Sequence, residues 1–135
     1  MYIKKALISA AIALTSSFAL AGQSNDVPVE IDLEGFSALG NMKTARFSDN
    51  DNEFIGCGTR TFAFGDGTSF NFGFCQAGIE EGASINCGTE DLSLISQINA
   101  ISDYSFITFR WDDLGNCTYV GSSTQSFYIP GKKDK

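Results

Sequence analysis

The stretch that decides the fold is residues 54–77, FIGCGTRTFAFGDGTSFNFGFCQA. Alternating phenylalanines flank Gly-Asp-Gly at 65–67, which predicts a β-hairpin with a three-residue loop and Gly67 in the left-handed conformation. A two-residue loop would instead set Phe62 opposite Asn71 and divide the aromatic residues between the two faces. Because a buried face fixes the register, we favour the pairing of Phe62 with Phe70.

Five phenylalanines share one face of the hairpin in this register: Phe62, Phe64, Phe70, Phe72 and Phe74. Such a set is typical of a hydrophobic core, so we expect this face to be buried. The alternative is that these rings form an aromatic platform that binds a ligand. Arg60 falls on the same face and is expected to contact the rings at the rim of the core by a cation–π interaction.

The first residues predict a secretory signal peptide of bacterial style at 1–21. Lys4 and Lys5 precede an apolar run at 6–18, and Ala19-Leu20-Ala21 has the small residues of a cleavage site. The run is shorter than the roughly 18 to 20 apolar residues of a membrane span. We therefore expect residues 22–135 to form one globular domain with a short basic C-terminal tail. The protein would be periplasmic or secreted, without membrane insertion after cleavage.

Four cysteines in an exported chain predict two disulfide bonds, for which three pairings are open. The hairpin register sets Cys57 directly opposite Cys75, which leaves Cys87 to pair with Cys117. A zinc site or a redox pair is the alternative. It is disfavoured because the sequence has no Cys-x-x-Cys spacing and no Lys or His beside any cysteine.

The N-terminal part of the domain alternates between apolar and acidic residues at 27–34, which predicts a half-buried strand. Pro28 near its start favours an edge position. Residues 42–48 predict a second, weaker strand, with Ile31 facing Ala45 and Glu30 facing Arg46.

The second half predicts a short strand at 83–87 and an amphipathic helix at about 90–101, with Thr89 as its cap. A second hairpin follows at 104–111 and 116–120, with Trp111 opposite Cys117, Phe109 opposite Tyr119 and the loop at 113–115. Residues 125–129 are a candidate last strand. The fold class is mainly β, within α+β: an antiparallel sheet of about seven strands, sandwich-like or barrel-like, with one packed helix and two disulfides.

The amino-acid composition excludes several kinds of active site and one class of partner. The 135 residues contain 16 acidic and 9 basic side chains and no histidine, for a formal charge of −7. Loss of Lys4 and Lys5 with the signal leaves 7 basic and 16 acidic residues, a charge of −9. Such a surface repels nucleic acid, and the missing histidine excludes Ser-His-Asp triads, Cys-His dyads and His-ligated zinc.

An acidic stripe is the candidate partner surface. Glu30, Asp32 and Glu34 lie at alternate positions and would point the same way from one strand, where a basic protein can dock. The alternative is that these charges only keep the protein soluble and prevent strand-to-strand aggregation.

The oxygen-rich segment at 49–53 is a weak calcium candidate, through Asp49, Asp51 and Glu53. It does not fit an EF-hand loop, because Phe54 and Arg60 stand where glycine and glutamate are needed. A solvated turn is the alternative, and we expect no cofactor.

Adjacent carboxylates at Glu80-Glu81 and Asp112-Asp113, with Tyr104, are the only hydrolase candidates, and both pairs fall in predicted turns. We therefore expect no enzyme. The favoured function is that of a small exported binding or interaction protein, including an inhibitor of a basic secreted enzyme. A structural or cell-envelope protein is the alternative.

Overall fold

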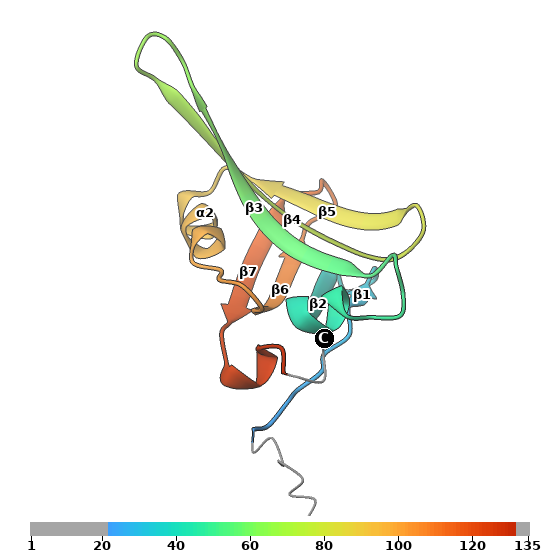
Figure 1. Ribbon diagram of the computed structural model, residues 1–135. Helices are drawn as coiled ribbons and strands as arrows, with labels where there is room; N and C mark the ends of the chain where they lie inside the picture. Colours follow the sequence, from blue (N-terminus) through green and yellow to red (C-terminus); the bar gives the residue numbers. More distant parts are fainter. Residues whose placement is uncertain (1–21, 132–135) are drawn as a thin grey trace, which may run out of the picture.

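The computed structural model describes residues 22–131, and the predicted signal peptide and the lysines of the tail lie outside the described residues. Two antiparallel sheets contain seven strands in total, which confirms the predicted mainly β class (Figure 1). The four-stranded sheet has the order β1-β2-β6-β7, and the three-stranded sheet has the order β3-β4-β5.

The four-stranded sheet consists of β1 (Glu30–Asp32), β2 (Ser37–Asn41), β6 (Phe106–Trp111) and β7 (Cys117–Ser123). Strand β1 is an edge strand as predicted, but it is much shorter than 27–34. It ends at Asp32 because the Asp32 carboxylate accepts a hydrogen bond from the Gly35 N–H and so stabilises a turn. Leu33, one of the alternating apolar residues of the predicted half-buried strand, lies in that turn and is exposed.

Two predicted registers in this sheet are wrong. Ile31 pairs with Ala38 of β2 rather than with Ala45. In the second hairpin Trp111 does oppose Cys117, but a bulge after Arg110 shifts the pairing, so that Phe109 opposes Val120 instead of Tyr119. The shift places Phe109 and Val120 together in the core.

The three-stranded sheet consists of β3 (Phe54–Ala63), β4 (Ser69–Glu80) and β5 (Ala83–Thr89). Phe62 pairs with Phe70, and Cys57 pairs with Cys75, as the sequence predicts. The hairpin closes with a hydrogen bond from the Phe64 N–H to the Thr68 carbonyl, and Gly67 has a φ of +84°. The three-residue loop is thereby confirmed.

The helices are α1 (Met42–Arg46), α2 (Leu92–Asn99) and a single 3-10 turn, η1 (Ser126–Tyr128). Helix α1 replaces the strand predicted at 42–48, because the Asn41 side chain caps it by accepting from the Thr44 N–H. The predicted α2 exists but begins later than expected, since Asp91 rather than Thr89 is its cap. Turn η1 replaces the strand predicted at 125–129, and its Tyr128 ring stacks against Phe106.

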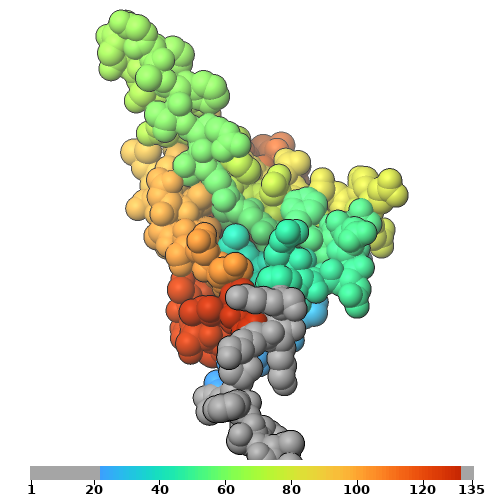
Figure 2. All heavy atoms as spheres, viewed as in Figure 1, coloured from blue at the N-terminus to red at the C-terminus, as the bar shows by residue number. Residues whose placement is uncertain are grey.

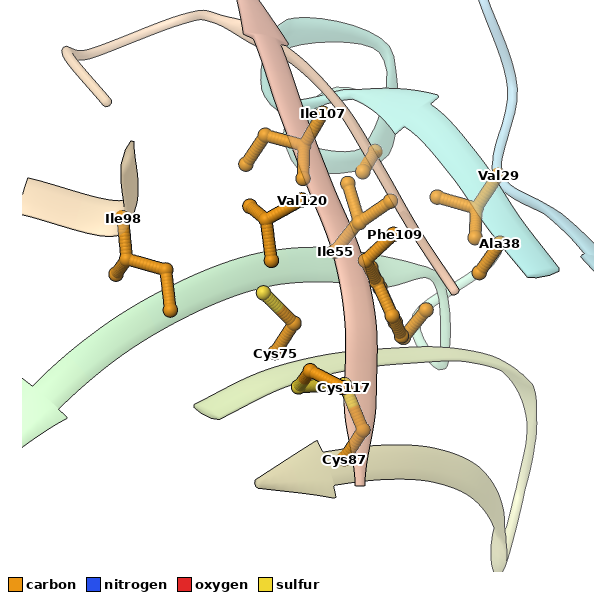
Figure 3. Packing of buried hydrophobic residues seen from close by; sticks show 12 residues of the cluster. Val29, Ala38, Ile55, Cys75, Cys87, Ile98, Ile107, Phe109, Cys117 and Val120 are labelled. Atoms are coloured by element: carbon orange, nitrogen blue, oxygen red, sulfur yellow. A yellow bond between two sulfur atoms is a disulfide. The ribbon is translucent and has the colours of Figure 1, made fainter. Parts of the chain in front are cut away.

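The core lies between the two sheets (Figure 3). Phe109 and Ile107 of β6 are fully buried and belong to one cluster with Ile55 and Ala77 of the other sheet. Both predicted disulfides, Cys57–Cys75 and Cys87–Cys117, are present. The second ties β5 to β7 and therefore joins the two sheets.

Candidate interaction surface

The most exposed element is the outer half of the β3–β4 hairpin, residues 60–71, which we call the arm. Every residue of the arm is exposed. Strand β5 pairs with β4 only from Gly73 onward, so within residues 22–131 the arm has just two strands and no third strand beside them. It stands clear of the body in both the ribbon and the space-filling view (Figure 1, Figure 2).

Three contacts hold the base of the arm in place. The Cys57–Cys75 disulfide joins the two strands. Helix α2 packs against Gly73 so closely that a Cβ there would come within 2.9 Å of Ile98 Cδ1. The Thr59 hydroxyl lies 3.0 Å from the Asn99 side-chain oxygen, to which it donates a hydrogen bond. The arm therefore leaves the body in a defined direction.

The phenylalanine face of the hairpin is not a core, and the expectation that it would be buried is wrong. Phe62, Phe64 and Phe70 are 53%, 54% and 38% exposed. The rings of Phe62 and Phe70 stack on each other across the strands, with centroids 6.2 Å apart. The core of the molecule forms on the opposite face of the sheet, where Cys75 and Ala77 are buried.

The same aromatic face continues onto the body, where each ring lies over a glycine. A Cβ on Gly58 would come within 2.9 Å of the Phe74 ring, and a Cβ on Gly88 within 2.6 Å of the Phe72 ring. Glycine on these strands leaves room for the rings to lie along the sheet, a known way in which aromatic residues compensate for glycine in strands. The rings of this face therefore lie flat along the sheet, from the body to the arm.

Two opposite charges mark the ends of the arm. Arg60 lies near the base, with its guanidinium carbon 4.9 Å from the Phe74 ring centroid, which confirms the expected cation–π contact. Asp66 lies at the tip, where it accepts hydrogen bonds from the Thr68 hydroxyl and the Thr68 N–H. These two bonds lower the pKa of Asp66 below its ordinary value. The arm is neutral overall, on an acidic protein.

The acidic stripe is only partly assembled. Glu30 and Asp32 are exposed and lie on one face of β1, as predicted, but Glu34 lies beyond the strand in the β1–β2 turn. Asp32 is also engaged with the Gly35 N–H. Two of the three carboxylates therefore share a strand face, on an edge strand of only three residues.

The carboxylates of the weak calcium candidate do not gather into a cluster. Glu53 accepts hydrogen bonds from the Val29 N–H and from the Ser48 hydroxyl, which turns its carboxylate toward the body. Within residues 22–131 there is no group of three or more such side chains arranged to hold a metal ion.

The hydrolase candidates serve as turn residues. Asp112 accepts hydrogen bonds from the Leu114 N–H and from both the backbone and side-chain amides of Asn116. The Asn116 bonds lower the pKa of Asp112, which is the opposite of what a general acid needs. Glu80 and Glu81 end β4 and enter its turn to β5, in the other sheet.

Sequence reasoning missed one buried charge and the exposure of the arm. Lys43 is 1% exposed and its Nζ lies 2.8 Å from Asp26 Oδ1 and 2.7 Å from Ser24 Oγ. Nothing in a five-residue helix signals this burial. The exposure of the arm did have a signal, because the strand predicted at 83–87 is too short to cover a hairpin that reaches from 54 to 77.

No protein family, no curated protein and no solved structure was found to match this chain. Among the described residues no helix is long and apolar enough to cross a membrane.

Proposed function

We propose that the protein is an exported, non-enzymatic interaction protein and that the arm is its contact surface. The observation that carries the proposal is the exposure of Phe62, Phe64 and Phe70 on an element that projects from the body. A contiguous exposed apolar patch of this kind is typical of a protein–protein contact. Aromatic residues also supply much of the binding energy in such contacts.

The construction of the arm supports binding rather than stability. An isolated two-stranded hairpin is only marginally stable in water, and here the Cys57–Cys75 bridge and helix α2 hold its base. A preorganised element binds with a smaller loss of conformational entropy. The arm rings contribute little to the core, so their presence is best explained by a partner that covers them.

Two finer versions of this function stay open as proposals. Insertion of the arm into the cleft of a basic secreted enzyme would make the protein an inhibitor, and the acidic body would favour that encounter. Assembly of the protein within the cell envelope would make it a structural component. Both versions require the arm, whereas the Glu30–Asp32 surface would serve the first alone.

The test is affinity capture from the exported fraction with the disulfides intact. The bait proteins are the wild type, the arm variant Phe62→Ser/Phe70→Ser, and the body variant Leu92→Ser/Leu114→Ser. The body variant is a matched control, because Leu92 and Leu114 are 72% and 81% exposed. We expect one specific band that the arm variant loses and the body variant keeps. Equal capture by all three proteins would contradict the proposal.

A further inference from the structure

We propose that the arm pairs with the arm of a second copy of this chain, face to face and in antiparallel orientation. The inference rests on the proposed function, because it names the occupant of the same surface. It is carried by the exposed aromatic face and by the placement of the only two charges on the arm, Arg60 and Asp66.

A two-fold axis through the level of the Phe62–Phe70 pair makes the arm complementary to itself. Gly58 lies four strand residues from Phe62 toward the base, roughly 13 Å from the axis. Asp66 lies toward the tip, in the loop beyond the Phe64–Thr68 closing pair, which is itself roughly 7 Å from the axis. The axis therefore brings Asp66 of one copy past the level of Arg60 of the other and toward the level of Gly58 and Phe74. The guanidinium of Arg60 lies over Phe74 at that level.

Both charges are available for such a pair. The only salt bridge within residues 22–131 joins Lys43 to Asp26, so neither Arg60 nor Asp66 has an ionic partner in the described chain. Asp66 uses Oδ1 for both of its bonds with Thr68, which leaves Oδ2 for the partner. Two-fold symmetry produces the Arg60–Asp66 contact twice.

The acidic bodies do not prevent this pairing. In the antiparallel arrangement the Thr59 positions, where each body begins, lie six residues apart along the strands, or about 20 Å. That separation is about two and a half times the Debye length of ~8 Å at physiological ionic strength, so the repulsion between the two bodies is largely screened. The arm itself is neutral and adds no repulsion.

The area of the aromatic face predicts a weak dimer. Covering the exposed parts of Phe62, Phe64 and Phe70 in both copies removes roughly 600 Å² of surface. A stable dimer buries about 1,200 Å² or more, and the adjoining face with Arg60 and Phe72 supplies part of the remainder. We expect a dissociation constant on the order of micromolar, as for transient contacts.

A lipid occupant is disfavoured by the backbone of the arm. Strand β3 is an edge strand, and β4 has no neighbour on its far side before Gly73. Insertion into hydrocarbon would leave both rows of backbone groups without hydrogen-bond partners, at a cost of several kcal/mol for each group. A second arm covers the rings and leaves these edges in water.

Sedimentation equilibrium of the disulfide-bonded protein tests the inference at loading concentrations from about 5 to about 500 µM. We expect a monomer–dimer equilibrium for the wild type and for Leu92→Ser/Leu114→Ser, and a monomer for Phe62→Ser/Phe70→Ser. Arg60→Asp and Asp66→Arg should each weaken dimerisation about tenfold, because each reverses two symmetric contacts. The double variant Arg60→Asp/Asp66→Arg should recover most of that loss.

One further variant separates reversal of the Asp66 charge from disruption of the turn that Asp66 stabilises. Asp66→Asn keeps an acceptor for Thr68 and removes only the charge, so it should weaken the dimer less than Asp66→Arg. A wild type that stays monomeric throughout would overturn self-pairing, while loss of capture by the arm variant would still support the proposed function. Self-pairing would also be overturned by a dimer that Phe62→Ser/Phe70→Ser does not weaken. Binding of the monomer to phosphatidylcholine vesicles through Phe62 and Phe70 would overturn it too.

Discussion

The rings of Phe62 and Phe70 stack across β3 and β4 with centroids 6.2 Å apart, although both side chains are exposed to solvent. They therefore stabilise the hairpin locally and contribute nothing to the core between the sheets. Phe109, in contrast, is fully buried in that core. The two kinds of phenylalanine have separable effects on stability.

Replacing the arm rings should leave the fold intact. We expect Phe62→Ser/Phe70→Ser to lower the free energy of unfolding by about 1 kcal/mol or less, since only an exposed cross-strand pair is lost. Phe109→Ala should lower it by about 3 to 5 kcal/mol, through loss of burial and a new cavity. Urea unfolding followed by circular dichroism measures both. Similar losses in the two variants would mean that the arm is packed in solution.

Removal of each disulfide should affect a different part of the molecule. They span sequence separations of 18 and 30 residues. By loop-closure entropy each contributes about 3 to 4 kcal/mol. Removing Cys57–Cys75 by paired Ser substitutions should also raise hydrogen exchange throughout residues 59–73. Removing Cys87–Cys117 should leave exchange in the arm unchanged. If exchange in the arm rises equally in both, Cys57–Cys75 does not fix its base.

The buried Lys43 should depend on Asp26. Asp26→Asn leaves the ammonium with only Ser24 and should lower the free energy of unfolding by about 1 to 2 kcal/mol. The loss is smaller than for a fully buried pair because Asp26 itself is exposed. Lys43→Met/Asp26→Asn should recover part of it, since no buried charge remains. Thermal unfolding of the single and double variants measures the coupling, and simple additivity would contradict it.

Acidification should loosen both hairpin turns. The pKa values of Asp66 and Asp112 are lowered by the hydrogen bonds that their carboxylates accept. A lowered pKa in the folded state means that the contribution to stability is present above the unfolded pKa and is lost as the pH falls through the folded pKa. Carboxyl NMR titration should give both groups a pKa below that of an ordinary aspartate. An ordinary value at Asp66 would mean that its bonds to Thr68 do not persist in solution.

The parts of the fold that local chemistry dictates could be predicted from the sequence. The Gly-Asp-Gly loop and the phenylalanine alternation gave the β3–β4 register, and the register placed Cys57 opposite Cys75. Helix α1 could not be predicted, because it depends on the Asn41 cap and on a tertiary bond from the Met42 N–H to the Ser105 carbonyl. The bulge after Arg110 likewise has no local signal in the sequence, and it brings Phe109 opposite Val120 in the core.

The exposure of the arm cannot be predicted from the periodicity of the sequence alone. Alternation states which side chains share a face, and the same pattern serves a core or a binding surface. What decides between them is the length of the neighbouring strand, and β5 ends its pairing at Gly73, short of the arm. The acidic stripe is incomplete for a related reason, since the β1–β2 turn removes Glu34 from the strand.

Photo-crosslinking in cells that produce the protein tests the proposed contact surface most directly. A photoreactive phenylalanine analogue replaces Phe64 on the arm in one strain and Leu114 on the body in another; the two side chains are 54% and 81% exposed. We expect a discrete crosslinked product from position 64 and none from position 114. Products from position 114 alone, or the same products from both positions, would contradict the claim that the arm is the contact surface.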